Sequence, residues 1–220
     1  MKKQIVAILL TLSLLILPGC SQEIDNEELF RRSFKQLQKQ TALHVRNEQY
    51  FGKNLADIKL LAVRDEWRSG ENFYWESADA DQFLCYNQSY WTIQPNRHTQ
   101  WKRHKNPISS FSDWWNDYSC EQFLEAEVTF RKEGKHIVLE QRKDHGFDNC
   151  TVSRQISTNT FYMTKDGQIV RITLMTVTYN GTEADPEEVH SVDKQEYYIT
   201  PVDANVAEEK IMEQYRTVSE

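Results

Sequence analysis

The hydrophobic residues of this chain follow two different periods. Residues 27–40 carry apolar side chains every three or four positions, as on one face of an amphipathic helix. The apolar positions are Leu29, Phe30, Phe34 and Leu37. Asp25 or Asn26 can cap the start of this helix, because an Asp or Asn side chain accepts a hydrogen bond from the first free backbone N–H groups.

After residue 40 the period becomes two, which indicates β-strands with one apolar and one polar face. The clearest strand is 124–131, and residues 135–142 continue its pattern beyond a Glu133-Gly134 turn. Lys165-Asp166-Gly167 separates two further strands, and Asp-Gly favours a tight hairpin turn. The remaining predicted strands, including that pair, are 58–67, 72–76, 82–86, 89–94, 98–103, 155–164, 168–179 and 188–199.

Two more segments have helical spacing. Residues 107–118 present a broad apolar face, and Ala207, Ile211 and Tyr215 form a stripe in a final helix after Pro201. The links between the predicted strands are short, which favours antiparallel pairing over parallel βαβ units. We therefore predict an α+β fold: a curved antiparallel sheet, or half-barrel, with N- and C-terminal helices and one helical insertion packed on its concave face.

The N-terminus has the features of an export signal. Lys2 and Lys3 precede an apolar run at 5–17, which is too short to cross a bilayer and ends at Pro18-Gly19-Cys20. Leu17-Pro-Gly-Cys20 resembles the lipobox of bacterial lipoproteins. That resemblance implies cleavage before Cys20 and a lipid, such as palmitate, on its sulfur. The predicted organisation is a signal peptide at 1–19, a lipidated tether at 20–26 and one domain at 27–220.

Charge limits the partners of the exported domain. The formal net charge of the chain is -7, and loss of Lys2 and Lys3 with the signal peptide makes it -9. An acidic chain without a basic face is a poor binder of nucleic acid. The lipid itself is then expected to attach the protein to the membrane. We expect a location in the bacterial cell envelope, facing outside the cytoplasm.

Cysteine usage suggests a disulfide. With Cys20 assigned to the lipid, three cysteines remain in an exported chain, an odd number that predicts one disulfide and one thiol. Cys120 and Cys150 flank the open end of the predicted 124–142 hairpin, so we favour a Cys120–Cys150 bond with Cys85 as a core thiol. The alternative is three reduced cysteines that act as small core residues.

The order of elements resembles the lipoprotein-carrier superfamily, which includes the LolA/LolB carriers and LppX-like lipoproteins. The similar segments are the helix from Glu27 to Gln40, the short strands from Ile58 to Arg103, the aromatic stretch Cys85–Pro95 and the hairpin Lys165–Val170. The resemblance implies an incomplete antiparallel barrel with helices in its opening. It covers most of the mature chain and transfers no individual binding residue.

Motifs for catalysis and metal binding are absent from the sequence. It contains no His-x-x-x-His pair, no Gly-x-Ser-x-Gly elbow and no glycine-rich phosphate loop. The polar cluster at 144–150 has no standard metal spacing and is typical of a turn. We therefore expect no cofactor, no metal and no enzymatic activity. A hydrolase that uses Asp113 and Asp117 is the weakest of three hypotheses.

Aromatic residues supply the candidate ligand contacts. The candidates are Tyr90, Trp91, Trp101, Trp114 and Trp115. Their rings can line a cavity for acyl chains, or they can fill the core of a curved sheet. The leading hypothesis is a lipid-anchored binding protein that holds an apolar ligand, a lipid or acyl chains, in a half-barrel cavity. The alternative is an envelope interaction or sensor module without a bound ligand, which would have a protein partner.

Overall fold

The computed structural model describes residues 25–77, 81–93, 100–147, 153–180 and 188–218. The predicted signal peptide, Cys20 and Cys150 lie outside the described residues, and so does most of the predicted tether. Predictions about these segments therefore stay predictions.

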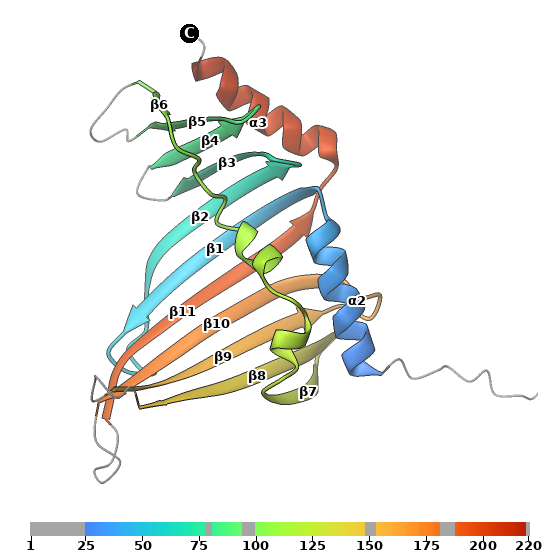
Figure 1. Ribbon diagram of the computed structural model, residues 1–220, viewed down its shortest axis with the longest axis vertical. Helices are drawn as coiled ribbons and strands as arrows, with labels where there is room; N and C mark the ends of the chain where they lie inside the picture. Colours follow the sequence, from blue (N-terminus) through green and yellow to red (C-terminus); the bar gives the residue numbers. More distant parts are fainter. Residues whose placement is uncertain (1–24, 78–80, 94–99, 148–152, 181–187, 219–220) are drawn as a thin grey trace, which may run out of the picture.

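In the described part of the chain, eleven strands form one curved antiparallel sheet (Figure 1). The strands are β1 (Ala42–Gly52), β2 (Lys59–Ser69), β3 (Asn72–Ser77), β4 (Gln82–Tyr86), β5 (Ser89–Ile93), β6 (Lys102–His104), β7 (Glu127–Glu133), β8 (His136–Phe147), β9 (Ser153–Met163), β10 (Ile169–Asn180) and β11 (Glu188–Pro201). Their order across the sheet is β6-β5-β4-β3-β2-β1-β11-β10-β9-β8-β7, with β6 and β7 at the two open edges. This confirms the predicted fold class.

Strand β1 joins the two halves of the sheet, and the sequence prediction missed it. It pairs with β2 on one side and with β11, about 150 residues later in the chain, on the other. Its alternation is visible in retrospect, because the side chains of Leu43 and Val45 are buried while Arg46 is exposed. The signal was weak because polar Asn47 lies on the buried face.

Helix α2 (Asn26–Lys39) covers one face of the sheet, which we call the inner face. Asp25 caps it, since its side chain accepts a hydrogen bond from the backbone N–H of Glu27. The apolar side of α2 packs on β1, β8, β9, β10 and β11. The rings of Phe30 and Phe34 contact those of Phe161 and Phe123, and all four are buried. The inner face beside α2 is therefore filled.

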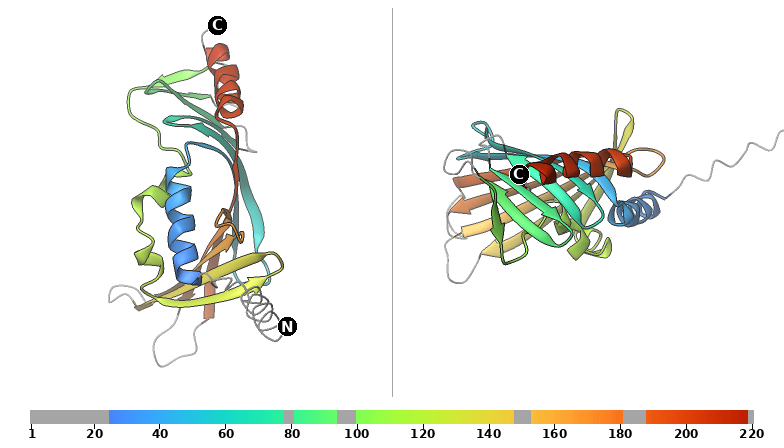
Figure 2. Two further views of the ribbon diagram at one scale, coloured as in Figure 1. Left: turned by 90° about the vertical axis from the view of Figure 1, so that its right-hand side faces the viewer. Right: turned by 90° about the horizontal axis from the view of Figure 1, so that it is seen from above.

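Helix α3 (Ala204–Val218) packs on the opposite, outer face, which differs from the prediction that the helices share the concave face. Its buried Ile211 packs with Tyr74 and Leu84, and Tyr215 contacts Trp91. The cross-strand pairs Trp67↔Tyr74, Tyr74↔Leu84 and Leu84↔Trp91 lie on one face of the sheet. His44 stacks on Trp67 there, whereas its neighbour Val45 points to the α2 side. Figure 2 shows the two helices on different sides.

The predicted helical insertion is a mostly irregular segment, residues 105–126, which we call the strap. It contains two short 3₁₀ turns, η1 (Asp113–Asp117) and η2 (Glu121–Phe123). In a regular helix that begins at residue 107, the N–H of Phe111 would donate a hydrogen bond to the carbonyl of Pro107. That N–H instead donates to Glu66 of β2 at 3.1 Å. Tertiary hydrogen bonds thus replace helical ones along this segment.

The strap is also attached to α2. The side-chain amide of Gln38 donates to the carbonyls of Trp115 and Tyr118, at 3.0 and 2.9 Å. Arg31 forms an ion pair with Glu121 at 2.5 Å. The strap therefore runs along the inner face between α2 and the strands β2 to β6, which we call the wing (Figure 1).

Among the described cysteines, Cys85 and Cys120 are both free, buried thiols, so the predicted Cys120–Cys150 disulfide is not formed in the structure. Two features separate this region from a simple hairpin. Glu127, the first residue of β7, pairs with Arg142 of β8. β8 continues beyond this pair to Phe147, so its end lies about 16 Å past the start of β7 at the usual rise of a strand. Meanwhile the strap folds back before β7 and buries Cys120 in the core beside α2.

Candidate functional site

A cavity of about 1070 Å³ remains on the inner face, between the wing and the strap. Three neighbouring strands supply its floor, because Phe73, Cys85 and Tyr90 are aligned in register on β3, β4 and β5. Pro107 and Ile108 of the strap close it from the other side. The cavity thus has an apolar surface on both walls.

Cys85 belongs to the floor as an inert group. Its thiol lies 3.5 Å from the carbonyl of Glu71, which it can reach as a donor. Burial raises the pKa of the Cys85 thiol, so the reactive thiolate is disfavoured at neutral pH. The structure therefore gives Cys85 a packing role in the cavity wall.

Polar and charged side chains form the edges of the cavity. Arg68 of β2 forms an ion pair with Asp113 of the strap. At the β6 edge, a ring nitrogen of His104 lies 2.6 Å from the hydroxyl of Thr92. Arg103 is directly opposite Trp91, so it donates to the hydroxyl of Ser89, at 3.1 Å, on the α3 side of the sheet. The cavity is therefore amphiphilic: apolar side chains of the sheet and of the strap face each other across it, and most of its other lining residues are polar or charged.

A buried carboxylate attaches the strap beside the cavity. Glu66 precedes Arg68 by two positions on the inner face of β2 and is 0% exposed. Its oxygens accept hydrogen bonds from the hydroxyls of Ser110 and Ser112 and from the N–H of Phe111. Burial raises the pKa of Glu66 to about 7, although the two serine bonds and the charge of Arg68 oppose the rise. The position of the strap thus depends on a group that titrates near neutral pH.

The structure separates the five aromatic residues that the sequence singled out. Tyr90 lines the cavity. Trp91 and Trp101 pack against α3 on the outer face, where the indole N–H of Trp101 donates to Thr217 at 3.1 Å. Trp115 is 1% exposed in the core beside α2, and Trp114 packs against that core. The candidates therefore divide among three places and do not form one aromatic binding surface.

Sequence reasoning missed the charged edge of the cavity. Arg103, His104 and Lys105 are consecutive in an acidic chain, so this basic run was visible in the sequence. Arg68, in contrast, reaches the cavity only because β2 and β3 pair through a turn at Gly70. Asp113, one of the two carboxylates of the hydrolase hypothesis, faces the cation of Arg68, and Asp117 is exposed at the end of η1.

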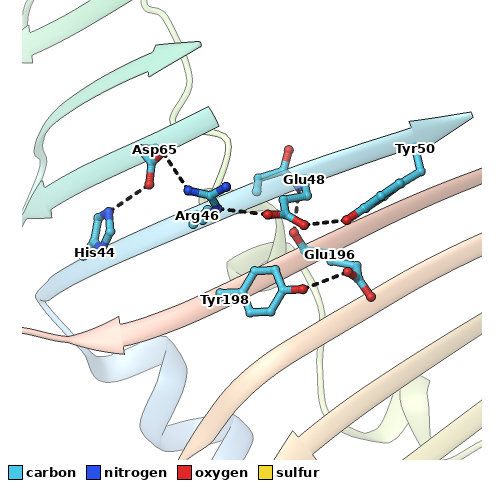
Figure 3. A network of polar contacts seen from close by, with 8 residues as sticks. His44, Arg46, Glu48, Tyr50, Asp65, Glu196 and Tyr198 are labelled. Carbon is cyan, nitrogen blue, oxygen red and sulfur yellow. Dashed lines mark hydrogen bonds and ion pairs between the residues drawn. The ribbon is translucent and has the colours of Figure 1, made fainter. Parts of the chain in front are cut away.

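A second polar cluster lies on the outer face of the central strands (Figure 3). Glu48 of β1 and Glu196 of β11 are directly opposite each other, and like charges in such a pair repel. Glu48 accepts hydrogen bonds from Arg46 at 3.0 Å and from Tyr50 at 2.5 Å. Arg46 also lies 3.9 Å from Asp65 of β2, which contacts His44 at 3.1 Å.

Glu196 has its own set of donors. Lys194 lies 3.0 Å away, Tyr198 donates at 2.9 Å, and Arg171 of β10 forms an ion pair. Burial raises the pKa of Glu196, but these three hydrogen bonds outweigh it and hold that pKa below its ordinary value. The donors around Glu48 and Glu196 therefore offset the repulsion between the two carboxylates where β1 pairs with β11.

Metal-binding groups are not assembled in the part of the chain that the structure describes: it contains no cluster of three or more His, Cys, Asp or Glu side chains that could hold an ion. In the polar stretch at 144–150, the carboxylate of Asp144 is bound by Arg154 and by the N–H of Gly146. These contacts hold the pKa of Asp144 well below its usual range. The stretch from 148 to 150 lies outside the described residues.

Comparison with known proteins gives distant structural neighbours only. No protein-family model and no curated protein matches the chain. Among solved structures, a LolA superfamily protein from Nitrosomonas europaea is 9% identical, with 82% of this chain and 94% of that chain covered and a TM-score of 0.32. A DUF1329 family protein from Desulfovibrio piger is 13% identical, with 80% and 91% covered and a TM-score of 0.28.

The chain has the half-barrel fold that the sequence resemblance implied. The order of the strands in the described sheet and their antiparallel register establish this fold. At TM-scores of this size the two neighbours carry no argument about ligand or partner. Within the described residues, no helix has both the length and the hydropathy of a membrane span.

Proposed function

We propose that this protein is a lipid-anchored binding protein of the bacterial cell envelope, which faces outside the cytoplasm and holds a lipid or an acyl chain in the wing cavity. The observation that carries the proposal is the cavity itself. Aromatic side chains fill the inner face beside α2, yet about 1070 Å³ stays open beside Phe73, Tyr90 and Ile108. Pockets that enclose small molecules have volumes of about 300–1000 Å³.

The strap offers a site at which the cavity can be filled without disturbing the core. Ser109 lines the cavity and is exposed. We expect Ser109→Trp to weaken binding of a fluorescent fatty acid by about 5- to 150-fold, because overfilling an occupied site costs about 1–3 kcal/mol. The measurement is a fluorescence titration, together with mass spectrometry of the lipids extracted from the purified protein.

Ser119→Trp is the matched control, since Ser119 is exposed on the same strap and does not line the cavity. It should bind the fatty acid as the unmodified protein does. A Ser109→Trp variant with unchanged affinity would contradict binding in this cavity. So would a purified protein that yields no lipid and binds no fatty acid.

The anchor is tested separately. We expect Cys20→Ala to release the protein from the membrane fraction, because the net charge of -9 offers no electrostatic attachment to anionic lipid. A single acyl chain holds a protein only marginally, whereas two or more hold it stably. Fractionation in high salt measures the effect, and circular dichroism should show an unchanged fold. A variant that remains on the membrane in high salt would disprove the lipobox interpretation.

One observation favours the interaction module as a second candidate function. Large apolar side chains are exposed around the end of the β1–β2 hairpin, where Leu55, Leu60 and Leu61 are 57%, 53% and 69% exposed. Exposed apolar groups that gather in one place mark contact surfaces more often than isolated ones do. Cross-linking from Leu61 to a single envelope protein, with no ligand in the cavity, would favour this function over ligand binding.

A further inference from the structure

The strap is attached to the rest of the molecule in two ways along its length. Its later part is fixed to the core, where Trp115 is buried and its carbonyl accepts a hydrogen bond from Gln38 of α2. Its first part, residues 105–112, is bonded instead to the carboxylate of Glu66 on β2. Residues 107–109 of that first part form one wall of the cavity. The position of this wall therefore depends directly on the Glu66 carboxyl group.

Three consecutive residues of the strap converge on Glu66. The hydroxyls of Ser110 and Ser112 and the backbone N–H of Phe111 contact its two carboxylate oxygens, and the Glu66 side chain is buried. A hydroxyl accepts as well as donates, so the two serines can also bond to a protonated carboxyl group. Because the three contacts share one partner, they can break together. Their loss would bring Glu66 into contact with water and open this side of the cavity.

The surroundings of Glu66 favour its neutral form while the strap is in place. Charged and titratable groups near it lie on β2, on the strap and on β11: Arg64, Arg68, Asp113 and Tyr197. Val45 of β1 and Trp75 of β3, which are directly opposite Glu66, carry no charge. Burial raises the pKa of Glu66 to about 7, although Arg68 opposes the rise. Burial also raises the pKa of Tyr197 to about 12, so Tyr197 stays neutral between pH 5 and pH 8.

We propose that residues 105–112 form a proton-dependent gate of the wing cavity, which is held closed while Glu66 carries a proton and opens when that proton is released. This inference rests on the proposed function, because a gate matters only if the cavity holds a ligand. In the open state Glu66 is in water and has its ordinary pKa of 4.5, against about 7 in the closed state. Between these values the closed state retains a proton that the open state has released. The equilibrium therefore moves toward the open state as pH rises.

The gate is tested by hydrogen exchange of backbone amides in the full-length protein, which is kept soluble in a non-ionic amphipol. The N–H of Phe111 is the direct reporter, because it donates to Glu66 itself. After correction for the intrinsic pH dependence of exchange, we expect the open fraction at Phe111 to rise on the order of 50-fold between pH 5 and pH 8. The amides of β9 and β10 should stay more protected than Phe111 at every pH, because local opening does not require unfolding of the sheet. A fluorescent fatty alcohol, which carries no titrating group, should leave the cavity faster at pH 8 than at pH 5 by a similar factor.

Variants of the attachment separate the proton from the shape of the side chain. Glu66→Gln should hold the exchange of Phe111 near its pH 5 level throughout, since glutamine has a similar shape and does not ionise. Glu125→Gln, at an exposed position of the same strap, is the matched control and should behave as the unmodified protein does. Ser110→Ala/Ser112→Ala keeps the carboxyl group and removes two bonds that oppose the rise of its pKa, so the change in exchange should move to higher pH.

Exchange of Phe111 that does not change with pH in the unmodified protein would overturn the gate and leave the proposed function standing. So would a Phe111 amide as protected as those of β9 and β10, because the strap would then open only when the protein unfolds. Opening as expected in a protein that binds no fatty alcohol would instead overturn the proposed function, and with it the role of the gate.

Discussion

Replacement of Trp115 by alanine is expected to lower the free energy of unfolding by about 3–5 kcal/mol, the usual cost of deleting a buried aromatic side chain. Trp115 is 1% exposed and contacts Trp114 and Tyr197 with ring centroids 5.7 and 6.4 Å away. The strap has little regular hydrogen bonding of its own. Its position therefore depends strongly on this side chain and on the hydrogen bonds from Gln38 and to Glu66.

Urea denaturation followed by far-ultraviolet circular dichroism measures the loss. Trp101→Ala is the comparison, because Trp101 is only half-buried and packs on α3 at the other face. This variant should lose about 1–2 kcal/mol of unfolding free energy, which is the expected cost of removing part of an aromatic contact and one hydrogen bond. An equal or smaller loss for Trp115→Ala would show that the strap is held mainly by its polar contacts.

The second large effect is a dependence of stability on pH that arises from Glu66. Its pKa is raised from an ordinary 4.5 to about 7 in the folded protein, mainly by burial. Between these values the unfolded chain releases a proton that the folded chain retains. The contribution of Glu66 is therefore fully present below about pH 4.5, falls as pH rises, and is lost above about pH 7. The expected total is about 3 kcal/mol, from 1.36 kcal/mol for each pKa unit.

Glu66→Gln should abolish this decline. The glutamine amide has nearly the same shape, carries no charge, and can still accept hydrogen bonds from Ser110 and Ser112. We expect the variant to lose less stability than the unmodified protein between pH 5 and pH 8, by up to about 3 kcal/mol. Urea denaturation across this range gives the comparison.

Glu125→Gln, at an exposed position of the strap, is the control and should follow the unmodified protein. Other titrating groups contribute the same background to all three proteins, so only the difference between curves reports on Glu66. Parallel curves for Glu66→Gln and the unmodified protein would mean that the Glu66 carboxylate stays ionised in its buried site.

Several parts of the fold followed from local sequence. The bounds of α2 were predicted to within about one residue, because Asp25 supplies a cap and the apolar period is regular. The stripe of Ala207, Ile211 and Tyr215 correctly predicted a final helix. Asp166-Gly167 correctly predicted the β9–β10 hairpin, where Gly167 adopts a φ of 89° that favours glycine.

The candidate site was predicted only in part. Tyr90 was expected to contact ligand and lies in the cavity, but Trp91 points away from it to α3. Alternation along a strand shows that neighbours face opposite sides, yet it does not show which side is covered by which helix. The same ambiguity placed α3 on the wrong face. Arg68 joined the site through cross-strand pairing, which no local pattern reports.

The sequence by itself determined the local elements: helices where apolar residues recur at helical spacing, strands where they alternate, and turns where Asp-Gly or Gly allows a positive φ. Its acidic composition also argued against nucleic-acid binding, and its N-terminal Leu-x-Gly-Cys pattern predicted a lipid-anchored protein of the cell envelope. Only the tertiary structure decided that β1 and β11 meet through a neutralised Glu48–Glu196 pair and that the strap bonds to Glu66 instead of forming a helix. Such contacts join residues far apart in the chain, and their free energy depends on burial and on charged partners that local spacing does not encode.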